Sequence, residues 1–414
     1  MKIIGVIAEY NPFHNGHAYQ IEKIKKELHA DFVIAAMSGD FVQRGAPAII
    51  DKYARAKMAL LGGADLVLEL PVLFATSSAE NFAMAGVTLF DRLGCVDGIC
   101  FGAETDDLSA LSSIAAVLAE EPKAYQEKLF SALKDGLSYP AARSRALGEF
   151  VPDAHHLLAS PNNILAVEYL KAIARRHASL HAYPILREGA SYHEENVLAP
   201  SNHIRASATG IRNLLADHSG YDVLTDTMPQ DVLAILKEYL AHAPALDADC
   251  FSAQLGYQIL LHHADGFSDI LDCNPEISNR ICKNYSKFST FSEFCENNKS
   301  RDITYTRMSR ILLHILLQLT KELETLGKEL DFVPYARILG FRKSGQLLSY
   351  IKESSSIPLI SKLANAKKML SPQAYALLEK DIFAADFYEQ VKCSRSAAGL
   401  PFLTEYEQQI VILP

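Results

Sequence analysis

Two histidines near the N-terminus, His14 and His17, have the types and the spacing that phosphate binding requires. They lie in the run NPFHNGH, residues 11–17, three positions apart with a glycine between them. Two imidazoles placed in this way can donate hydrogen bonds to phosphate oxygens while negative charge builds at an α-phosphorus, without forming a covalent bond themselves. Two surface histidines in a turn would give the same letters, so the position of the run in the fold decides between the two interpretations.

The elements predicted around this run favour phosphate binding. An apolar strand, Ile3–Ala8, precedes it, and a helix over 17–29 follows. Alternation of this kind is typical of βα units that wind a parallel sheet, where ligands bind at the carboxyl edge and helix N-termini face phosphates. Further strands are predicted at 31–37, 65–70 and 98–101, with helices at 52–62 and 77–93 between them.

The rest of the chain changes pattern twice. Residues 106–176 have the period of successive helices, Leu180–Leu186 is predicted as one more strand, and a helix follows at 206–216. From about residue 220 no strand alternation is visible, and a small last unit is expected after about 331. We therefore predict an α/β fold with a mainly α-helical C-terminal half. Its parts are a Rossmann-like, doubly wound parallel sheet in 1–217, a helical RNA-binding region in 218–330 and a small basic α unit in 331–414.

The composition is that of an ordinary globular protein. Of the 414 residues 49% are apolar and 21% charged, and the net charge is −9, so any nucleic acid must meet a local basic face. The start of the chain has no signal-peptide pattern, and no apolar run reaches the ~20 residues of a bilayer span. Seven scattered cysteines are typical of reduced thiols, so a cytoplasmic location without membrane contact is expected. The histidine pairs 155–156 and 262–263 have no ligand at metal-binding spacing, and no metal site is predicted.

Several runs of residues resemble a known group of enzymes. The His-x-Gly-His arrangement resembles that of the HIGH-type nucleotidyltransferase superfamily, whose members transfer a nucleotidyl group from ATP and release pyrophosphate. The runs IAEYNPFHNGH (7–17), MSGDFVQRG (37–45), FGAE (101–104) and SPNNIL (160–165) resemble the bacterial tRNA(Met) cytidine acetate ligase family, and the resemblance extends over essentially the whole chain. It implies activation of acetate with ATP as acetyl-adenylate. The acetyl group would then pass to N4 of the wobble cytidine of elongator tRNA(Met), forming N4-acetylcytidine.

The same resemblance implies which residues hold ATP, with His14 and His17 as the catalytic pair. Acetate is an anion at pH 7, because carboxylates titrate near ~4, so its attack needs positioning and charge neutralisation rather than a general base. ATP normally carries Mg²⁺, for which the sequence names no dedicated ligand. The implied nucleotide-binding residues are Ile7, Ala8, Glu9, Tyr10, Asn11, Pro12, Phe13, His14, Asn15, Gly16, His17, Ala18, Tyr19, Gln20, Gly102, Asn162, Arg187 and Glu188.

Two other segments could reach the substrates. The run 206–212 resembles the second signature of the superfamily, in which Ser207, Thr209 and Arg212 would meet the leaving phosphates, although helix capping explains the hydroxyls nearly as well. Asp40 and Arg44 follow the second predicted strand at the carboxyl edge. There they could touch substrate or simply form a loop salt bridge.

Basic residues in the second half could bind RNA. Residues 280–310 contain seven basic and three acidic residues, and residues 335–368 contain seven basic residues and one acidic residue. On a helix that begins near Thr304, Arg307, Arg310 and His314 would form one polar stripe, which is either an RNA contact or a solvated surface. The candidate RNA-binding residues are Arg307, Arg310, Arg337, Arg342 and Lys343.

Two other functions stay open at this point. A small-molecule adenylyltransferase of the cofactor-biosynthesis type would share His14 and His17 but would leave residues 218–414 without a role. A non-enzymatic RNA-binding protein with a relict nucleotide fold would bind ATP and transfer no acetyl group.

Overall fold

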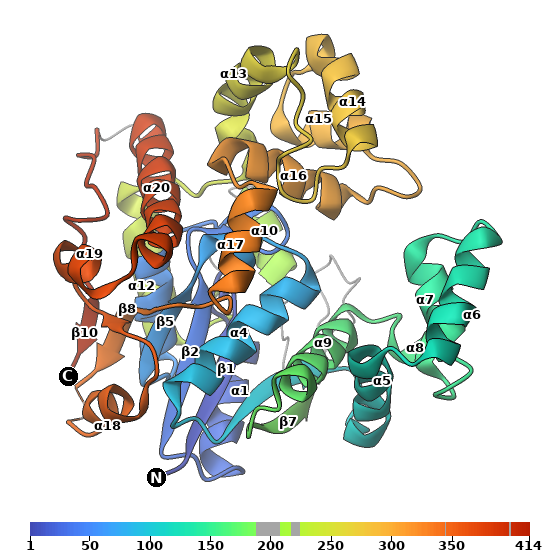
Figure 1. The fold of residues 1–414 in the computed structure, drawn as a ribbon. Coiled ribbons are helices and arrows are strands. Elements are labelled where there is room, and N and C mark those ends of the chain that lie inside the picture. Colours follow the sequence, from blue (N-terminus) through green and yellow to red (C-terminus); the bar gives the residue numbers. More distant parts are fainter. Residues whose placement is uncertain (188–207, 217–223, 344, 397–398) are drawn as a thin grey trace.

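A twisted, mainly parallel sheet runs through the centre of the molecule (Figure 1). The computed structural model describes residues 1–187, 208–216, 224–343, 345–396 and 399–414. The strands lie in the order β10-β8-β5-β2-β1-β6-β7, and β9 pairs with β8. Among these pairs only β5 and β8 are antiparallel. The strands are β1 (Ile3–Ala8), β2 (Phe32–Ser38), β5 (Leu66–Leu70), β6 (Gly98–Ala103), β7 (His181–Leu186), β8 (Ala336–Arg342), β9 (Leu359–Ile360) and β10 (Val411–Leu413); a separate hairpin contains β3 (Phe41–Val42) and β4 (Ala46–Pro47).

Helices cover both faces of this sheet. The helices of the first half are α1 (Asn15–Lys26), α2 (Lys52–Leu61), α3 (Val72–Ala75), α4 (Ala79–Leu93), α5 (Leu108–Glu120), α6 (Lys123–Lys134), α7 (Tyr139–Leu147), α8 (Ala154–Leu157), α9 (Pro161–Arg176) and α10 (Ala208–Ala216). Those of the second half are α12 (Gln230–His242), α13 (Ser252–His262), α14 (Pro275–Asn284), α15 (Phe291–Asn298), α16 (Tyr305–Leu317), α17 (Lys321–Glu329), α18 (Leu347–Ser354), α19 (Ala366–Met369) and α20 (Pro372–Arg395), with 3-10 turns at Ala248–Phe251, Tyr285–Lys287 and Leu363–Asn365.

The central strands are buried on both faces because their side chains alternate between two apolar clusters. In β1, Ile3 belongs to one cluster, whereas Ile4 and Val6 belong to the other. The first cluster contains apolar residues of α4, α9 and α16, and the second those of α1, α2 and α12. A parallel sheet with helices on both faces needs this pattern. The doubly wound sheet predicted from the sequence is therefore confirmed. In the part of the chain that the structure describes, no helix has the length and apolar character to cross a membrane.

The sequence pattern predicts no strands after about residue 220, and this prediction is wrong because three later segments form strands. β8, β9 and β10 extend the sheet beyond β5. Residues 331–414 are thus not a separate α unit, because they contribute strands to the sheet of the first half. The pattern of β8 was hidden because Arg337 interrupts an otherwise apolar strand, although its side chain is buried.

The charge of Arg337 is accommodated by a buried ion cluster. Arg337 lies opposite Glu69 in the pairing of β8 with β5, and its Nη2 lies 2.7 Å from Glu405 Oε1. Lys52 Nζ lies 2.8 Å from Glu69 Oε1 and 2.5 Å from Glu405 Oε1. Two cations and two carboxylates from four segments therefore neutralise one another, and they join the C-terminal segment to α2 and the sheet.

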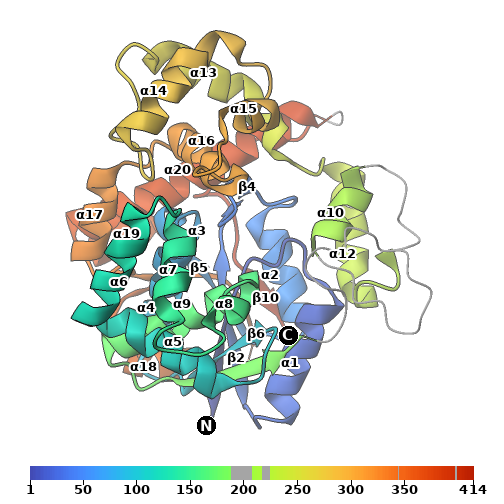
Figure 2. The same ribbon diagram turned by 90° about the vertical axis from the view of Figure 1, so that its right-hand side faces the viewer.

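The helices α13 to α16 form a module at the carboxyl edge of the sheet (Figures 1 and 2). Ser309 Oγ of α16 donates a hydrogen bond to Gly45 O at 2.8 Å, in the β3-β4 hairpin that follows β2. Gly45 has φ +77°, and a Cβ there would lie 2.3 Å from the backbone nitrogen of Arg310, so only glycine permits this approach. The hairpin therefore connects the helical module directly to the edge at which the strands end.

Replacing Lys52 with Met should lower the free energy of unfolding by about 3–5 kcal/mol, because it leaves the carboxylates of Glu69 and Glu405 with less compensating charge in the interior. Equilibrium urea denaturation measures the effect. Lys57→Met is the matched control, since Lys57 lies on the same helix and forms no ion pair with a described residue; its cost should be about 0.5 kcal/mol or less. Equal costs for the two variants would contradict a stabilising role of the cluster.

Candidate active site

Two histidines cap the first turn of α1. Nδ1 of His14 accepts the N–H of Gly16 at 3.0 Å, and Nδ1 of His17 accepts the N–H of His14 at 3.2 Å. The two rings stack with their centroids 3.8 Å apart. Because each Nδ1 is an acceptor, each neutral ring carries its proton on Nε2. The motif thus presents two Nε2–H donors at a helix N-terminus, where the helix dipole also favours anions.

Both rings are neutral at pH 7. The pKa of His14 is lowered to about 3. Burial is the largest cause, and the positive charges of Arg187 and Arg212 add to it. Burial, followed by His14 and Arg187, holds the pKa of His17 well below its ordinary value. Neutral imidazoles donate hydrogen bonds as dipoles, so the positive charge available to a phosphate here belongs to the arginines.

The loop between β1 and α1 is held firmly in place. Asn11 Oδ1 accepts the N–H of Ile49 at 2.9 Å. Tyr10 and Phe13 are buried beneath the loop with ring centroids 5.0 Å apart, and Tyr10 stands edge-on to His17 at 4.8 Å. The strand, loop and helix predicted around the histidines are all present, and the aromatic side chains of the loop support the His17 ring from below.

A buried arginine that the sequence analysis missed, Arg55 of α2, sets the position of this loop against its neighbour. Its guanidinium donates hydrogen bonds to Glu9 O at 2.8 Å, to Ser38 O at 3.1 Å and to Gly39 O, and its Nε donates to Ile50 O at 3.1 Å. Glu9 follows β1 and Ser38 ends β2, so one side chain joins the carboxyl ends of the two central strands. The sequence does contain a signal for this role, because Arg55 is a basic residue among the apolar positions of the predicted helix 52–62.

The residues expected to complete the nucleotide pocket lie together around the carboxyl end of β6. The N–H of Arg187 donates to Ala103 O at 2.9 Å, and a Cβ on Gly102 would lie 3.3 Å from Arg187 Cγ, so the arginine side chain passes over the glycine. Asn162 Nδ2 donates to Glu104 Oε1 at 2.5 Å. Gly102, Asn162 and Arg187 therefore meet at one corner of the carboxyl edge. Glu188, the last member of the implied set, lies outside the described residues.

Arg212 of α10 reaches the loop after β1. Its Nη1 donates to Asn11 O at 2.8 Å and its Nη2 to Thr209 Oγ1 at 2.9 Å. Burial lowers the pKa of Arg212, the Glu9 carboxylate opposes this, and the positive charge of Arg44 adds to the lowering. Arg44, exposed at the tip of the β3-β4 hairpin, therefore lies within electrostatic range of the same loop. Ser207 lies outside the described residues.

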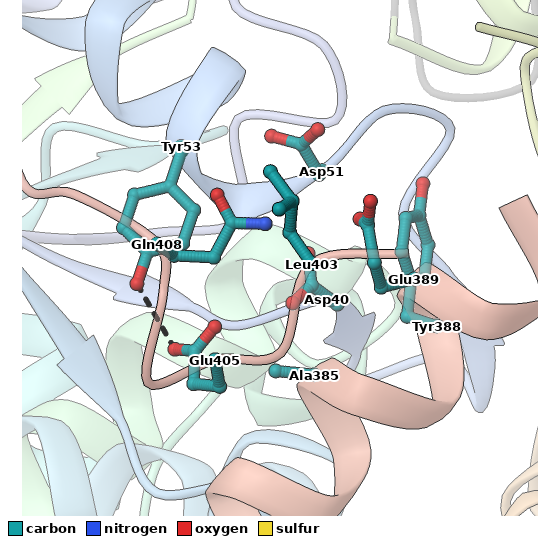
Figure 3. Close-up of a pocket in the computed structure, with 9 residues that line it drawn as sticks. All are labelled: Asp40, Asp51, Tyr53, Ala385, Tyr388, Glu389, Leu403, Glu405 and Gln408. Carbon is teal, nitrogen blue, oxygen red and sulfur yellow. Dashed lines mark hydrogen bonds between the residues drawn. The ribbon is translucent and has the colours of Figure 1, made fainter. Parts of the chain in front are cut away.

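The salt-bridge interpretation of Asp40 agrees with the structure, because Lys52 Nζ and Arg55 Nη2 each lie 4.0 Å from its carboxylate. Asp40 is buried, and its Oδ1 accepts the N–H of Lys52 at 2.7 Å, in the first turn of α2. Burial raises the pKa of Asp40 to about 7, although Lys52 and Arg55 act in the opposite direction. The pocket that Asp40 lines with Tyr53 and Glu405 has a volume of about 10 Å³, which is room for about one water (Figure 3). Asp40 is therefore a structural residue.

Two of the candidate RNA-binding residues form ion pairs with acidic residues of the protein itself. Arg337 belongs to the buried ion cluster, and Arg310 Nε lies 3.1 Å from Asp272 Oδ2. His314, the third member of the predicted stripe, is fully buried, with Nε2 3.0 Å from Thr76 O. The stripe and the assignment of Arg337 to RNA are therefore wrong. The physical reason is that α16 packs against the sheet loops as well as its neighbouring helices, so it has no fully solvated face.

The other candidate RNA-binding residues lie at opposite ends of the sheet. Arg307 is half-buried in the first turns of α16, on the module above the carboxyl edge. Arg342 and Lys343 end β8, and the N–H of Arg342 donates to Asp65 O, next to the start of β5. Because β8 is antiparallel to β5, these two residues lie at the amino edge, a strand length away from the histidines.

A dedicated magnesium ligand is not expected from the sequence. No group of three or more His, Cys, Asp or Glu side chains there is arranged to hold a metal ion. The carboxylates of Asp40 and Glu104 already accept hydrogen bonds from Lys52 and from Asn162. We therefore assign Mg²⁺ no protein ligand, since ATP can carry it on its own phosphates.

The low pKa of His14 makes stability depend on pH. The unfolded chain protonates this histidine near pH 6.5 and the folded chain only near pH 3, so its contribution is complete above about 6.5 and is lost as the pH falls towards 3. In urea denaturation at pH 7 and pH 5, His14→Asn, which keeps a good N-cap, should reduce the acid-induced loss of unfolding free energy by about 2 kcal/mol. Identical losses in the variant and the wild type would refute the low pKa.

Comparisons with known proteins agree with this geometry. The family model described as HIGH Nucleotidyl Transferase matches residues 1–399. The chain is 40% identical to the tRNA(Met) cytidine acetate ligase of Acetivibrio thermocellus, with 100% of both chains covered, and 39% identical to that of Clostridium kluyveri, with 92% of this chain and 96% of the relative covered.

Solved structures of Thermotoga maritima TmcAL match the whole chain at 29% identity, with 100% of each chain covered. The TM-score is 0.91 for the apo form and 0.89 for the form bound with alpha-thio ATP. Sequence and fold therefore agree over the full length. The chain belongs to the HIGH nucleotidyltransferase family and, within it, to the tRNA(Met) cytidine acetate ligases.

Proposed function

We propose that this chain activates acetate with ATP as acetyl-adenylate and transfers the acetyl group to N4 of the wobble cytidine of elongator tRNA(Met), giving N4-acetylcytidine. The observation that carries this proposal is the pair of neutral Nε2–H donors, His14 and His17, at a helix N-terminus on the carboxyl edge. The relatives are named for tRNA(Met), cytidine and acetate, and the Thermotoga maritima protein binds an ATP analogue. A tRNA substrate also supports a cytoplasmic location.

In the first step the acetate oxygen attacks the α-phosphorus of ATP, a P–O bond forms, and pyrophosphate leaves with the electrons of the broken P–O bond. Acetate arrives as an anion, so no base is needed. The Nε2–H groups of His14 and His17 would donate to α-phosphate oxygens as charge builds there, and Arg187 and Arg212 would neutralise the leaving phosphates. Gly16, Asn11 and the rest of 7–20 would shape the backbone around the nucleotide.

In the second step the cytidine N4 attacks the acetyl carbon of the mixed anhydride. A C–N bond forms, the C–O bond to AMP breaks, and the amine loses one proton. The base must be unstacked for its exocyclic amine to reach the anhydride. We assign no residue as the proton acceptor.

We propose a division of labour along the chain. Residues 1–217, with the strands that 331–414 add to the sheet, would form the adenylate, and the helical region 218–330 would bind RNA. The module of α13 to α16 supports this, because it is joined to the carboxyl edge through the contact of Ser309 with Gly45. Arg307 lies on this module and is the candidate retained for RNA contact.

His17→Ala should lower acetate-dependent exchange of pyrophosphate into ATP by about 10²–10³-fold, because one donor to the developing charge is lost. The affinity for tRNA should stay within about twofold. His29→Ala, beyond the other end of α1, is the control and should retain wild-type exchange. If pyrophosphate exchange requires a mononucleotide and does not depend on acetate, the chain is instead a small-molecule adenylyltransferase. If His17→Ala reduces exchange and tRNA affinity equally, the division of labour is contradicted.

Arg307→Glu should weaken the binding of elongator tRNA(Met) and make it less dependent on salt, because a phosphate contact is lost and a repulsive charge is added. Acetate-dependent exchange measured without tRNA should not change. Lys26→Glu applies the same charge reversal at the C-terminal end of α1 and should leave tRNA binding unchanged. If the two reversals have the same effect, Arg307 makes no specific RNA contact.

A further inference from the structure

An exposed aromatic pair stands on the helical module, away from the candidate active site. The rings of His263 and Tyr285 stack with centroids 4.0 Å apart and an angle of 16° between their planes. His263 follows α13, and its Nδ1 donates to Leu260 O at 2.9 Å, which fixes the ring. Tyr285 follows α14 and remains 38% exposed. His263 thus covers one face of the tyrosine ring, and the remaining exposed area belongs to an aromatic residue whose position is already ordered.

Two exposed lysines lie close to Tyr285 in the sequence. Lys283 and Lys287 are exposed, two positions on either side of Tyr285, and neither forms an ion pair with a described residue. By contrast, Arg280 pairs with Glu276 and Lys299 pairs with Glu296. The segment around Tyr285 therefore contains two lysines that form no ion pair with a described residue, in a chain whose net charge is −9.

This combination fits RNA better than a protein or a small molecule. Single-stranded RNA is recognised by stacking of unstacked bases on aromatic side chains while basic residues follow the backbone. A stacked pair held in place by a hydrogen bond loses little further freedom when a base is added. The exposed apolar side chains of α13, such as Tyr257 and Leu260, lack a stacked partner ring among the described residues and supply no such platform.

We propose that the open face of Tyr285, backed by His263, receives an unpaired base of the RNA substrate, while Lys283 and Lys287 contact the phosphates on either side of it. This subsite rests on the proposed function, because it concerns how the same tRNA is held. It lies on the module that Ser309 and Gly45 join to the carboxyl edge, so an RNA bound to it is held by a part of the molecule fixed relative to the nucleotide site. The subsite adds affinity for looped-out nucleotides without reading the wobble base.

The test measures binding of an unmodified elongator tRNA(Met) transcript to the full-length chain and its variants by filter binding at several salt concentrations. Tyr285→Ala should weaken binding about 5- to 150-fold, which is the range for loss of one stacked base. Tyr285→Phe keeps the ring and should bind within about twofold of the wild type. The combined variant Lys283→Gln with Lys287→Gln should reduce the slope of log Kd against log salt by about 1.4, or 0.7 for each phosphate contact.

Tyr257→Ala is the matched control, because Tyr257 is an exposed tyrosine of the same module, and it should bind like the wild type. Acetate-dependent pyrophosphate exchange without tRNA should be unchanged in all of these variants, which separates RNA binding from misfolding. Wild-type affinity in Tyr285→Ala, or an equal loss in Tyr257→Ala, would overturn the subsite alone. A wild-type chain that does not bind this tRNA would overturn the proposed function and the subsite together.

Discussion

The candidate active site depends on one buried guanidinium. Arg55 is fully enclosed, and its donors are used on carbonyl oxygens of Glu9, Ser38, Gly39 and Ile50, with the Asp40 carboxylate 4.0 Å away. A buried charge without such partners would be very costly, whereas carbonyl groups turned towards it offset the loss of water. The loops after β1 and β2 must therefore keep their carbonyls around this side chain. The consequence is that the histidine-bearing loop is fixed before any substrate binds, which is the condition for effective electrostatic catalysis.

The charges at the site are divided between two kinds of residue. The stacked imidazoles of His14 and His17 stay neutral because desolvation and the charge of Arg187 lower the pKa of both, and Arg212 also lowers the pKa of His14. Their Nδ1 atoms are occupied by backbone N–H groups, so their orientation and tautomer are set by the first turn of α1. The guanidinium groups of Arg187 and Arg212 suit the multiple oxygens of a triphosphate. Directional donors and diffuse positive charge are thus supplied separately, and neither depends on a proton that titrates near pH 7.

Contacts between distant segments join the parts of the molecule. Gln43 of the β3-β4 hairpin donates its N–H to Glu9 Oε1 at 3.0 Å, and Gly45 two positions later accepts from Ser309 of α16. The helical module and the nucleotide loop therefore both contact the same short hairpin. Glu405 of the C-terminal segment forms an ion pair with Lys52. Lys52 in turn lies next to the loop that contains Asp40. The parallel sheet alone would leave these segments unconnected.

The sequence alone determined the features that depend on neighbouring residues. The alternation of strands and helices, and the NPFHNGH run between a strand and a helix, follow from local periodicity and capping. The five sheet strands of the first half and the position of His14 and His17 were therefore predictable, whereas β8, β9 and β10 were not. The tertiary structure decided the environment of each charge. Arg337 pairs with Glu69 and Glu405, His314 lies against Thr76, and Arg55 binds carbonyls of two loops. No local pattern encodes these partners, because the free energy of a charged side chain depends on what the fold packs around it.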